Sequence, residues 1–311
     1  MFTILITGGT GMIGKALTKA LLEKNYKVII LSRGGQSMVD SKALPGNIRY
    51  AEWNIEKQTI DEGAIGEADY IIHLAGAGVA DKRWSEKRKA EIVSSRIDSG
   101  RLLSGSLKKI PNKVKAVISA SAIGWYGADP VIPNPIPFKE NFRADDQFLG
   151  ITCQQWEEAI EPVSQLGKRL VKLRIGIVLS KSGGALVEFK KPLQFAVAAI
   201  LGTGKQLISW IHIDDVVKLF IAALENENMN GVYNAVAPNP VSNKELTIQL
   251  AKINKERFFI PIHVPSFVLK LLLGEMSVEI LKSATVSCEK VQQAGFEFQF
   301  PTIENALNDL Q

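Results

Sequence analysis

The sequence predicts an α/β protein in which a doubly wound parallel sheet carries a smaller, mostly helical C-terminal lobe. Short apolar stretches rich in β-branched residues alternate with helix-like patterns from Thr3 to Leu179. This alternation is typical of parallel sheets with helices on both faces. A glycine-rich turn joins the first apolar stretch to the first helical pattern. From Pro240 onward helical patterns predominate, so we expect the end of the chain to form a separate lobe.

The first element is an apolar strand, Thr3–Thr7, that runs directly into the glycine-rich turn. The turn satisfies both G-x-G-x-x-G and G-x-x-G-x-x-G, and its last two glycines are Gly11 and Gly14. Such glycines let the backbone approach a pyrophosphate, which also binds the free N–H groups of the following helix. We therefore expect a Rossmann-type dinucleotide site; a glycine-rich surface turn is the alternative. The predicted contacts are Gly8, Gly11, Met12, Ile13 and Gly14.

The second strand, Lys27–Arg33, ends where a dinucleotide site selects its cofactor. An NAD site usually places Asp or Glu there to accept hydrogen bonds from the ribose hydroxyls. Here the strand ends in Ser32 and Arg33, and the next carboxylate is Asp40. An arginine and a hydroxyl suit a 2′-phosphate, which an acid would repel. The sequence therefore predicts NADP(H), with Ser32 and Arg33 as contacts; the alternative is an exposed arginine that begins a loop.

Two further strands are predicted at Ile48–Trp53 and Ala68–Ala75. The second runs into Gly76–Gly78, whose small residues leave room for a cofactor at the carboxyl end of a central strand. We expect His73 to be structural, because a lone histidine in an apolar strand is more often packed and hydrogen-bonded than catalytic. A long helix is predicted from Trp84 to Lys108.

The fifth strand is predicted within Lys115–Gly127 and ends in hydroxyls, glycines and aromatic residues. The passage Pro130–Pro137 is expected to be a surface loop, because proline lacks the donor that a helix or a central strand requires. A helix over Asp146–Leu166 and a strand over Arg169–Leu179 complete the alternation.

Regular alternation weakens after Ser180. We expect a helical stretch that ends at Leu201, a strand that begins at Ile208, and a helix with Asp214 as its N-cap. Pro261 and Pro265 are expected to break the helices of the last segment.

These patterns divide the chain into two parts. Residues 1–235 form the predicted nucleotide-binding domain, with substrate-lobe insertions from about residue 180. Residues 236–311 form the mostly helical C-terminal lobe.

Composition excludes several classes of protein. The net charge is +5 and the pI is about 9.0, but the basic residues are scattered among acids, so we expect no nucleic-acid binding. The two cysteines, Cys153 and Cys288, are too few for a disulfide framework. We see no signal peptide and no apolar stretch of membrane-spanning length. We therefore expect a cytoplasmic protein.

Together these motifs resemble the short-chain dehydrogenase/reductase superfamily, in the extended and atypical branch related to nucleotide-sugar epimerases. The segments that carry this are Thr7–Gly14, His73–Gly76, Ser119–Ser121, Leu173–Arg174 and Trp210–Asp215. More narrowly, the chain resembles epimerase-family proteins that end in a short domain of unknown function. That likeness rests on Arg83-Trp84, Glu91, Ser95-Arg96, Ser121–Gly127, Cys153–Glu157, Gly202–Gln206 and Ala294–Pro301. It covers nearly the whole chain.

The resemblance implies a catalytic Tyr-x-x-x-Lys on the helix after the fifth strand, assisted by a serine. This sequence has Cys153 and Glu157 at the two positions of that pair. Ser121 matches the serine, and Tyr126 on the neighbouring loop offers a phenol, so these two are our candidate catalytic residues. The alternatives are that Tyr126 packs against the core and that Cys153 is a small buried residue.

The same resemblance implies further cofactor contacts on the fourth strand and on the long helix. These are Leu74, Ala75, Gly76, Glu91 and Arg96. It also places Arg174 and His212 toward the second lobe. Arg174 either anchors a phosphate or carboxylate or pairs with Asp214 or Asp215, and the sequence leaves both open.

Two functions follow from these observations. The first is an NADP(H)-dependent oxidoreductase or epimerase that acts on a small polar or sugar-like substrate. The second is a non-catalytic dinucleotide-binding sensor or partner module, which the missing Tyr-x-x-x-Lys favours. We expect a small molecule as the partner, consider a homodimer as the assembly, and expect no metal, nucleic acid or membrane.

Overall fold

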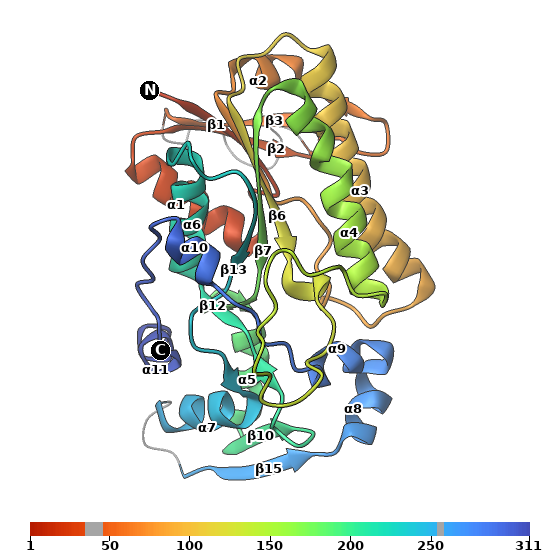
Figure 1. The fold of residues 1–311 in the computed structure, drawn as a ribbon, viewed down its shortest axis with the longest axis vertical. Coiled ribbons are helices and arrows are strands. Elements are labelled where there is room, and N and C mark those ends of the chain that lie inside the picture. The colour runs from red at the N-terminus through yellow and green to blue at the C-terminus, as the bar shows by residue number, and fades with distance from the viewer. Residues whose placement is uncertain (35–45, 254–257) are drawn as a thin grey trace.

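A computed structural model describes residues 1–34, 46–253 and 258–311; Asp40 lies outside them. Its centre is an eight-stranded sheet of order β13-β7-β6-β5-β1-β2-β3-β4 (Figure 1). Neighbouring strands pair in parallel, except that β4 is antiparallel to β3. The predicted doubly wound α/β class is confirmed. The strands are β1 Thr3–Thr7, β2 Lys27–Ser32, β3 Ile48–Asn54, β4 Thr59–Ile60, β5 Tyr70–His73, β6 Ala116–Ala122, β7 Arg169–Ile175 and β13 Gly231–Ala235.

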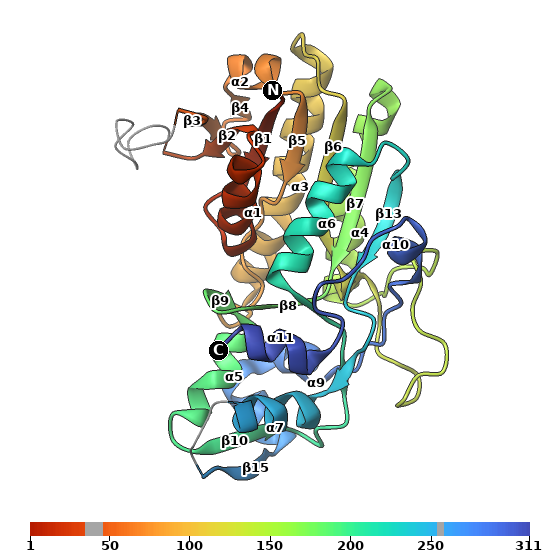
Figure 2. The same ribbon diagram turned by 90° about the vertical axis from the view of Figure 1, so that its left-hand side faces the viewer.

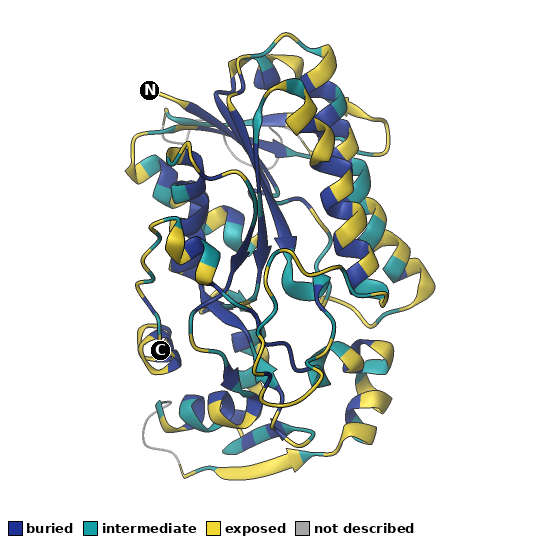
Figure 3. Cartoon of the chain, in the orientation of Figure 1, coloured by how far each residue is buried: buried dark blue, intermediate teal, exposed yellow. Residues whose placement is uncertain are grey.

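Helices cover both faces of this sheet, and the alternation of side chains along β1 shows how. Ile4 and Ile6 lie in one apolar cluster, whereas Leu5 lies in the cluster on the other face. The first cluster contains side chains of α1 and α6, and the second contains side chains of α3. The covering helices are α1 Met12–Glu23, α6 Ile213–Glu225, α2 Glu62–Glu67, α3 Glu86–Lys109 and α4 Phe148–Ile160. The central strands of the sheet are therefore buried on both faces (Figure 3).

The predicted strand over Arg169–Leu179 is wrong in one respect, because the chain breaks at Gly176. β7 ends at Ile175 in the central sheet, and β8, Ile177–Ser180, belongs to a smaller sheet with β12 and β9. A Cβ atom at Gly176 would lie 2.5 Å from the carbonyl oxygen of Ser209, so only glycine fits at the crossing.

The predicted helix that ends at Leu201 is also wrong in part. Helix α5, Ala185–Leu193, ends before Ala196, whose φ is 58°, and the chain then forms strand β10, Val197–Leu201. β10 pairs in parallel with β15, Ile260–Val264. Pro261 therefore lies inside a strand and does not break a helix.

Most of the remaining elements build the smaller lobe, which lies below the central sheet in Figure 2. Its chain then returns to the main domain, because Val286 and Val291 pack in the first apolar cluster with β1 and α6. The strands are β9 Gly183–Gly184, β11 Leu207–Ile208, β12 Trp210–His212 and β14 Val241–Ser242. The helices are α7 Asn243–Ile253, α8 Ser266–Leu273, α9 Ser277–Leu281, α10 Glu289–Gln293 and α11 Ile303–Asp309. Short 3-10 turns are η3 Ile123–Trp125, η4 Glu161–Leu166 and η5 Gly274–Met276.

Among the described residues, no helix has the length and apolar character needed to cross a membrane. The predicted surface loop at Pro130–Pro137 contains no helix or ladder strand. The predicted helix over Asp146–Leu166 is α4 followed by η4.

Candidate functional site

The glycine-rich turn lies between the carboxyl end of β1 and the start of α1. Gly8 has a φ of +70°, and a Cβ atom there would lie 2.8 Å from the carbonyl carbon of Leu74. A Cβ atom at Gly14 would lie 2.4 Å from the carbonyl oxygen of Gly8. Both positions therefore require glycine, one for the left-handed turn and one for the close packing of helix on turn.

The start of α1 is arranged to receive an anion. Gly11 is the N-cap, and no side chain caps the helix there. The first N–H groups of an α-helix have no partner within the helix, so those of Met12 and Ile13 point out of its end. Gly11 is exposed and Met12 is half-buried. The turn thus fits the pyrophosphate of a dinucleotide, as the sequence predicts.

The turn is supported by a contact between the ends of two neighbouring strands, Thr7 of β1 and His73 of β5. The Thr7 hydroxyl lies 2.8 Å from Nδ1 of His73 and accepts hydrogen bonds from the backbone N–H groups of Leu74 and Ala75. Since its lone pairs are used in this way, the hydroxyl donates to Nδ1. Burial lowers the pKa of His73 to about 4, so the ring is neutral. His73 is structural, in agreement with the sequence analysis.

The end of β2 carries Ser32, which is half-buried, and Arg33, which is exposed. The neighbouring charged groups come from the loop and helix after β5. A hydrogen bond from Arg88 holds the pKa of Glu91 below its usual range, and the charges of Lys82 and Arg33 add to this effect. Arg33 and Lys82 therefore lie close enough to Glu91 for their charges to act on its carboxylate.

The loop that follows β5 is held by two buried arginines of α3. Arg96 donates to the carbonyl oxygen of Ala77 at 3.0 Å and stacks 4.9 Å from the ring centre of Trp156. Arg88 donates to the carbonyl oxygen of Gly78 and pairs with Glu91 at 2.7 Å. Both guanidinium groups thus position the loop expected to line the cofactor. Ala75 is buried and Gly76 is exposed.

The two candidate catalytic residues lie in a buried polar network at the carboxyl ends of β6 and β7. Ser121 is 2% exposed and donates to Oε1 of Glu157 at 2.8 Å. The Arg174 guanidinium binds both oxygens of the Glu157 carboxylate, at 2.7 and 3.1 Å. Glu157 occupies the lysine position of the superfamily pair, and here it is the acid of a buried ion pair. The structure brings Ser121 to this position but joins it to a carboxylate.

Tyr126 belongs to the same network and has no exposed surface. Its hydroxyl donates to Oδ1 of Asn234 at 2.7 Å and accepts from Arg174 at 3.1 Å. Its ring stacks on Phe138 at a centre distance of 5.3 Å. Burial raises the pKa of Tyr126 to about 12. Tyr126 thus occupies the packing role that the sequence left open.

Cys153, at the tyrosine position of the pair, is 4% exposed. Burial raises the pKa of its thiol to about 12, and the charge of Glu157 adds to the rise. The thiol is therefore protonated at neutral pH, and it packs as the small buried residue that the sequence allowed for.

The pairing of Arg174 with Asp214 or Asp215 is wrong. Asp215 instead accepts hydrogen bonds from the backbone N–H groups of Gln299 and Phe300. The Glu157–Arg174 pair was not predicted from the sequence. A glutamate where the superfamily has lysine was the available signal, because a buried carboxylate requires a cationic partner.

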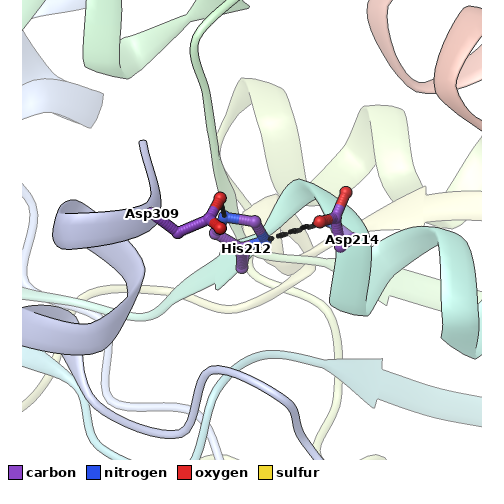
Figure 4. A group of neighbouring side chains, drawn as sticks. All are labelled: His212, Asp214 and Asp309. Carbon is purple, nitrogen blue, oxygen red and sulfur yellow. Dashed lines mark hydrogen bonds and ion pairs between the residues drawn. The ribbon is translucent and has the colours of Figure 1, made fainter. Parts of the chain in front are cut away.

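His212, Asp214 and Asp309 form the one group among the described residues whose ligand atoms lie close enough to hold a metal ion, within 4.8 Å of one another (Figure 4). His212, and not Asp214 as predicted, caps α6, because its Nδ1 accepts from the backbone N–H of Asp214 at 3.1 Å. The ring proton is then on Nε2, which lies 3.4 Å from the Asp309 carboxylate. A metal ion would have to displace either the cap or that proton.

These features define a class of protein. A parallel sheet with a glycine turn at its first strand-to-helix junction, and with small residues at the end of β5, is a nucleotide-binding Rossmann fold of the short-chain dehydrogenase/reductase kind.

Comparison with known proteins gives the family. Residues 4–146 match the NAD dependent epimerase/dehydratase family, and residues 264–310 match a domain of unknown function, DUF1731. The epimerase family protein YfhF of Bacillus subtilis is 34% identical over 99% of this chain and 97% of its own. The epimerase family protein ML0860 of Mycobacterium leprae is 33% identical over 98% of this chain and 94% of its own. The chain belongs to this epimerase family.

Solved structures agree with this assignment. The crystal structure of human epimerase family protein SDR39U1 with NADPH has a TM-score of 0.84 at 25% identity, over 99% of both chains. A UDP-glucuronic acid 4-epimerase from Bacillus cereus, solved with UDP-glucuronic acid and NAD, has a TM-score of 0.79 at 20% identity, over 99% of this chain and 98% of its own. The second likeness concerns the fold alone.

Proposed function

We propose that this protein binds NADP(H) and transfers hydride between that cofactor and a small polar or sugar-like molecule. The observation that carries the choice of cofactor is the end of β2, where Ser32 and Arg33 stand in the place of the acid of an NAD site. Arg33 is exposed, so its guanidinium is available to a 2′-phosphate. The NADPH in the human SDR39U1 structure supports this choice.

The residues that would hold the cofactor fit its parts. The N-terminus of α1 and the backbone at Gly11, Met12 and Ile13 suit the pyrophosphate, and Arg33 with Ser32 suits the phosphorylated ribose. The loop after β5, positioned by Arg88 and Arg96, lines the path toward the nicotinamide. When bound, the nicotinamide supplies or accepts a hydride.

Calorimetry with NADPH and NADH tests the cofactor proposal. We expect NADPH to bind at least about 10-fold more tightly, because the arginine-phosphate contact is a charge-assisted pair. Equal affinities would overturn it. The hydride transfer is tested by incubating the protein with a panel of small carbonyl and sugar-nucleotide substrates and monitoring the absorbance of NADPH.

A second candidate, a non-catalytic dinucleotide-binding sensor, is favoured by one observation. The groups at the family's acid/base positions are already engaged within the protein. Glu157 is paired with Arg174 and accepts a hydrogen bond from Ser121, and Cys153 is buried. Turnover of any substrate in the panel that is lost in Ser121→Ala would exclude the sensor. Tight NADPH binding with a measurable change in shape, and no turnover, would support it.

A further inference from the structure

A pocket in the smaller lobe has no lining residue in common with the proposed cofactor site or with the buried network around Glu157. Its volume is about 420 Å³, which is large enough for a small molecule. Its walls come from the turn after β10, from the junction of β14 with α7, from β15 and from the loop after β6. Of these elements, α7, β10 and β15 lie at the lower end of the molecule (Figure 1).

The turn after β10 is in direct contact with the first turn of α7. The N–H of Lys244 donates to the carbonyl oxygen of Gly204 at 3.0 Å. Gly204 has a φ of +71°, and a Cβ atom there would lie 2.4 Å from Cγ2 of Ile200 and 3.0 Å from Cβ of Lys244. Only glycine fits at this approach, which places Lys205, the next residue, close to Lys244.

Two buried amide side chains fix the same turn. Asn243 is 1% exposed, and its side-chain oxygen accepts from the N–H of Leu201 at 2.8 Å. Gln206 is 4% exposed, and its side chain donates to the carbonyl oxygen of Leu201 at 2.9 Å. The backbone N–H of Asn243 also donates to the carbonyl oxygen of Gln206 at 2.9 Å. The segment that carries Lys205 is therefore held in place at both ends.

The polar side of the pocket is cationic. Lys205 and Lys244 both line it, and both are exposed. In the described part of the chain, no Asp or Glu lines the pocket, and neither ammonium group has an ion-pair or hydrogen-bond partner. Like charges held close together repel each other and lower stability unless an opposite charge lies between them. An anion would supply that charge.

Two hydroxyl groups add donors without charge. The Oγ1 atom of Thr203 and the Oγ atom of Ser242 each accept from a backbone N–H two or three residues further on. Each hydroxyl therefore keeps its own proton for another acceptor. Both residues line the pocket beside the lysines. Ammonium and hydroxyl groups together are the donors that oxygen atoms of an anion require.

The rest of the pocket wall is apolar. Ile132, Pro133 and Leu207 form it. The loop that carries the first two is anchored by Asn134, which is 7% exposed and donates to Oδ1 of Asp129 at 2.9 Å. An apolar wall opposite a cationic one suits an organic anion better than an inorganic one, because the carbon skeleton of the ligand can lie against it.

We propose that this pocket binds the phosphate group of a small phosphorylated molecule. A phosphate monoester carries a charge of about −1.5 to −2 at neutral pH, which matches the two ammonium groups, whereas a single carboxylate would leave one of them unpaired. Lys205 and Lys244 contact the phosphate, and Thr203 and Ser242 donate to its oxygens. The site is separate from hydride transfer and does not depend on it.

A titration of the methyl-labelled full chain with phenyl phosphate, followed by NMR, tests the proposal. We expect the methyl signals of Ile132 and Leu207 to shift. Lys205→Gln and Lys244→Gln should each weaken the binding by at least about 10-fold, because each removes a charge-assisted contact. The matched control is Lys252→Gln, since Lys252 is an exposed residue in the last turn of the same helix and does not line the pocket. It should bind like the wild type.

Inorganic phosphate serves as the second probe and should bind more weakly than phenyl phosphate, because it makes no contact with the apolar wall. Four results would overturn the proposal. The first is that the signals of Ile132 and Leu207 do not shift. The second is a shift of the Ile13 signal alone, which would place the phosphate at the glycine turn. The third is unchanged affinity in both lysine variants. The fourth is equal affinity for the two probes, which would reduce the site to one for an adventitious ion only.

Discussion

The carboxyl edge of the central sheet is open at one end and closed at the other. At β1 and β2, Gly11 and Arg33 are exposed, and the first N–H groups of α1 have no partner in the helix. At β6 and β7, by contrast, Ser121, Glu157 and Arg174 are buried and bind one another.

The open end therefore has the character of a ligand-binding site, whereas the groups at the closed end are engaged with one another. A ligand site must leave donors and charges unsatisfied until the ligand arrives, whereas a network whose members already satisfy one another contributes to stability. Variants at the open end should therefore change cofactor affinity, and variants at the closed end should change the free energy of unfolding.

The largest effect is expected at the closed end, in Glu157→Ala. This change leaves the 2% exposed Arg174 without its carboxylate. Breaking a buried ion pair in this way lowers the free energy of unfolding by about 3–5 kcal/mol. Urea denaturation measures it. Glu158→Ala, at the exposed neighbouring position, is the control and should change stability by less than about 0.5 kcal/mol. Equal free energies of unfolding for the two variants would show that the Glu157–Arg174 pair does not stabilise the fold.

The next largest effect is expected for His73, whose ring accepts a hydrogen bond from Thr7 beneath the glycine turn. Its pKa is about 4 in the folded protein against 6.5 ordinarily, so between these values the unfolded chain binds a proton that the folded protein does not. Stability should therefore fall as the pH drops from about 6.5 to 4, by roughly 3 kcal/mol in total from this group. Urea midpoints of the wild type and His73→Gln, taken across this range, should diverge. Parallel curves would contradict the prediction.

At the open end, Arg33→Ala should weaken NADPH binding by about 10- to 100-fold, because a charge-assisted hydrogen bond contributes roughly 1.5–3 kcal/mol. NADH affinity and the thermal midpoint should stay the same. Calorimetry with both cofactors measures this. Lys27→Ala, an exposed basic residue at the opposite end of the same strand, is the matched control. An equal loss of affinity for NADH would mean that Arg33 does not contact the 2′-phosphate.

The smallest effect is expected for Tyr126→Phe. The change removes the donor to Asn234 and keeps the ring against Phe138, so the free energy of unfolding should fall by about 1–2 kcal/mol. NADPH affinity should be unchanged. If turnover of a substrate were lost while stability stayed the same, Tyr126 would be a catalytic acid after all.

The sequence predicts the glycine turn of the open end, with its strand and helix, because the signals for these elements are local. The glycines, the strand before them and the helix after them lie within one short segment, Thr3–Glu23, and each has a meaning that neighbouring residues fix. The class of the fold follows for the same reason, since alternation of strands and helices is a local pattern repeated along the chain.

The closed end could not be predicted in the same way, because its contacts join distant residues. Glu157 and Arg174 come from different elements, and Tyr126 meets Asn234 across 108 positions. The break at Gly176 was hidden for a related reason. The apolar pattern continues through it, and only the approach of Ser209 from another segment shows that the strand must change sheets.

The Glu157–Arg174 pair also constrains how this chain could acquire the catalytic pair of its superfamily. A single change of Glu157 to lysine would set an ammonium group against Arg174 and near Lys172, which lies 3.7 Å from the same carboxylate. Three cationic groups would then lie close together, and only Lys172 would keep an acidic partner, Glu161, at 2.6 Å. A change of Glu157 to lysine would therefore be coupled to the residue at position 174, so the effects of the two substitutions on stability should not simply add.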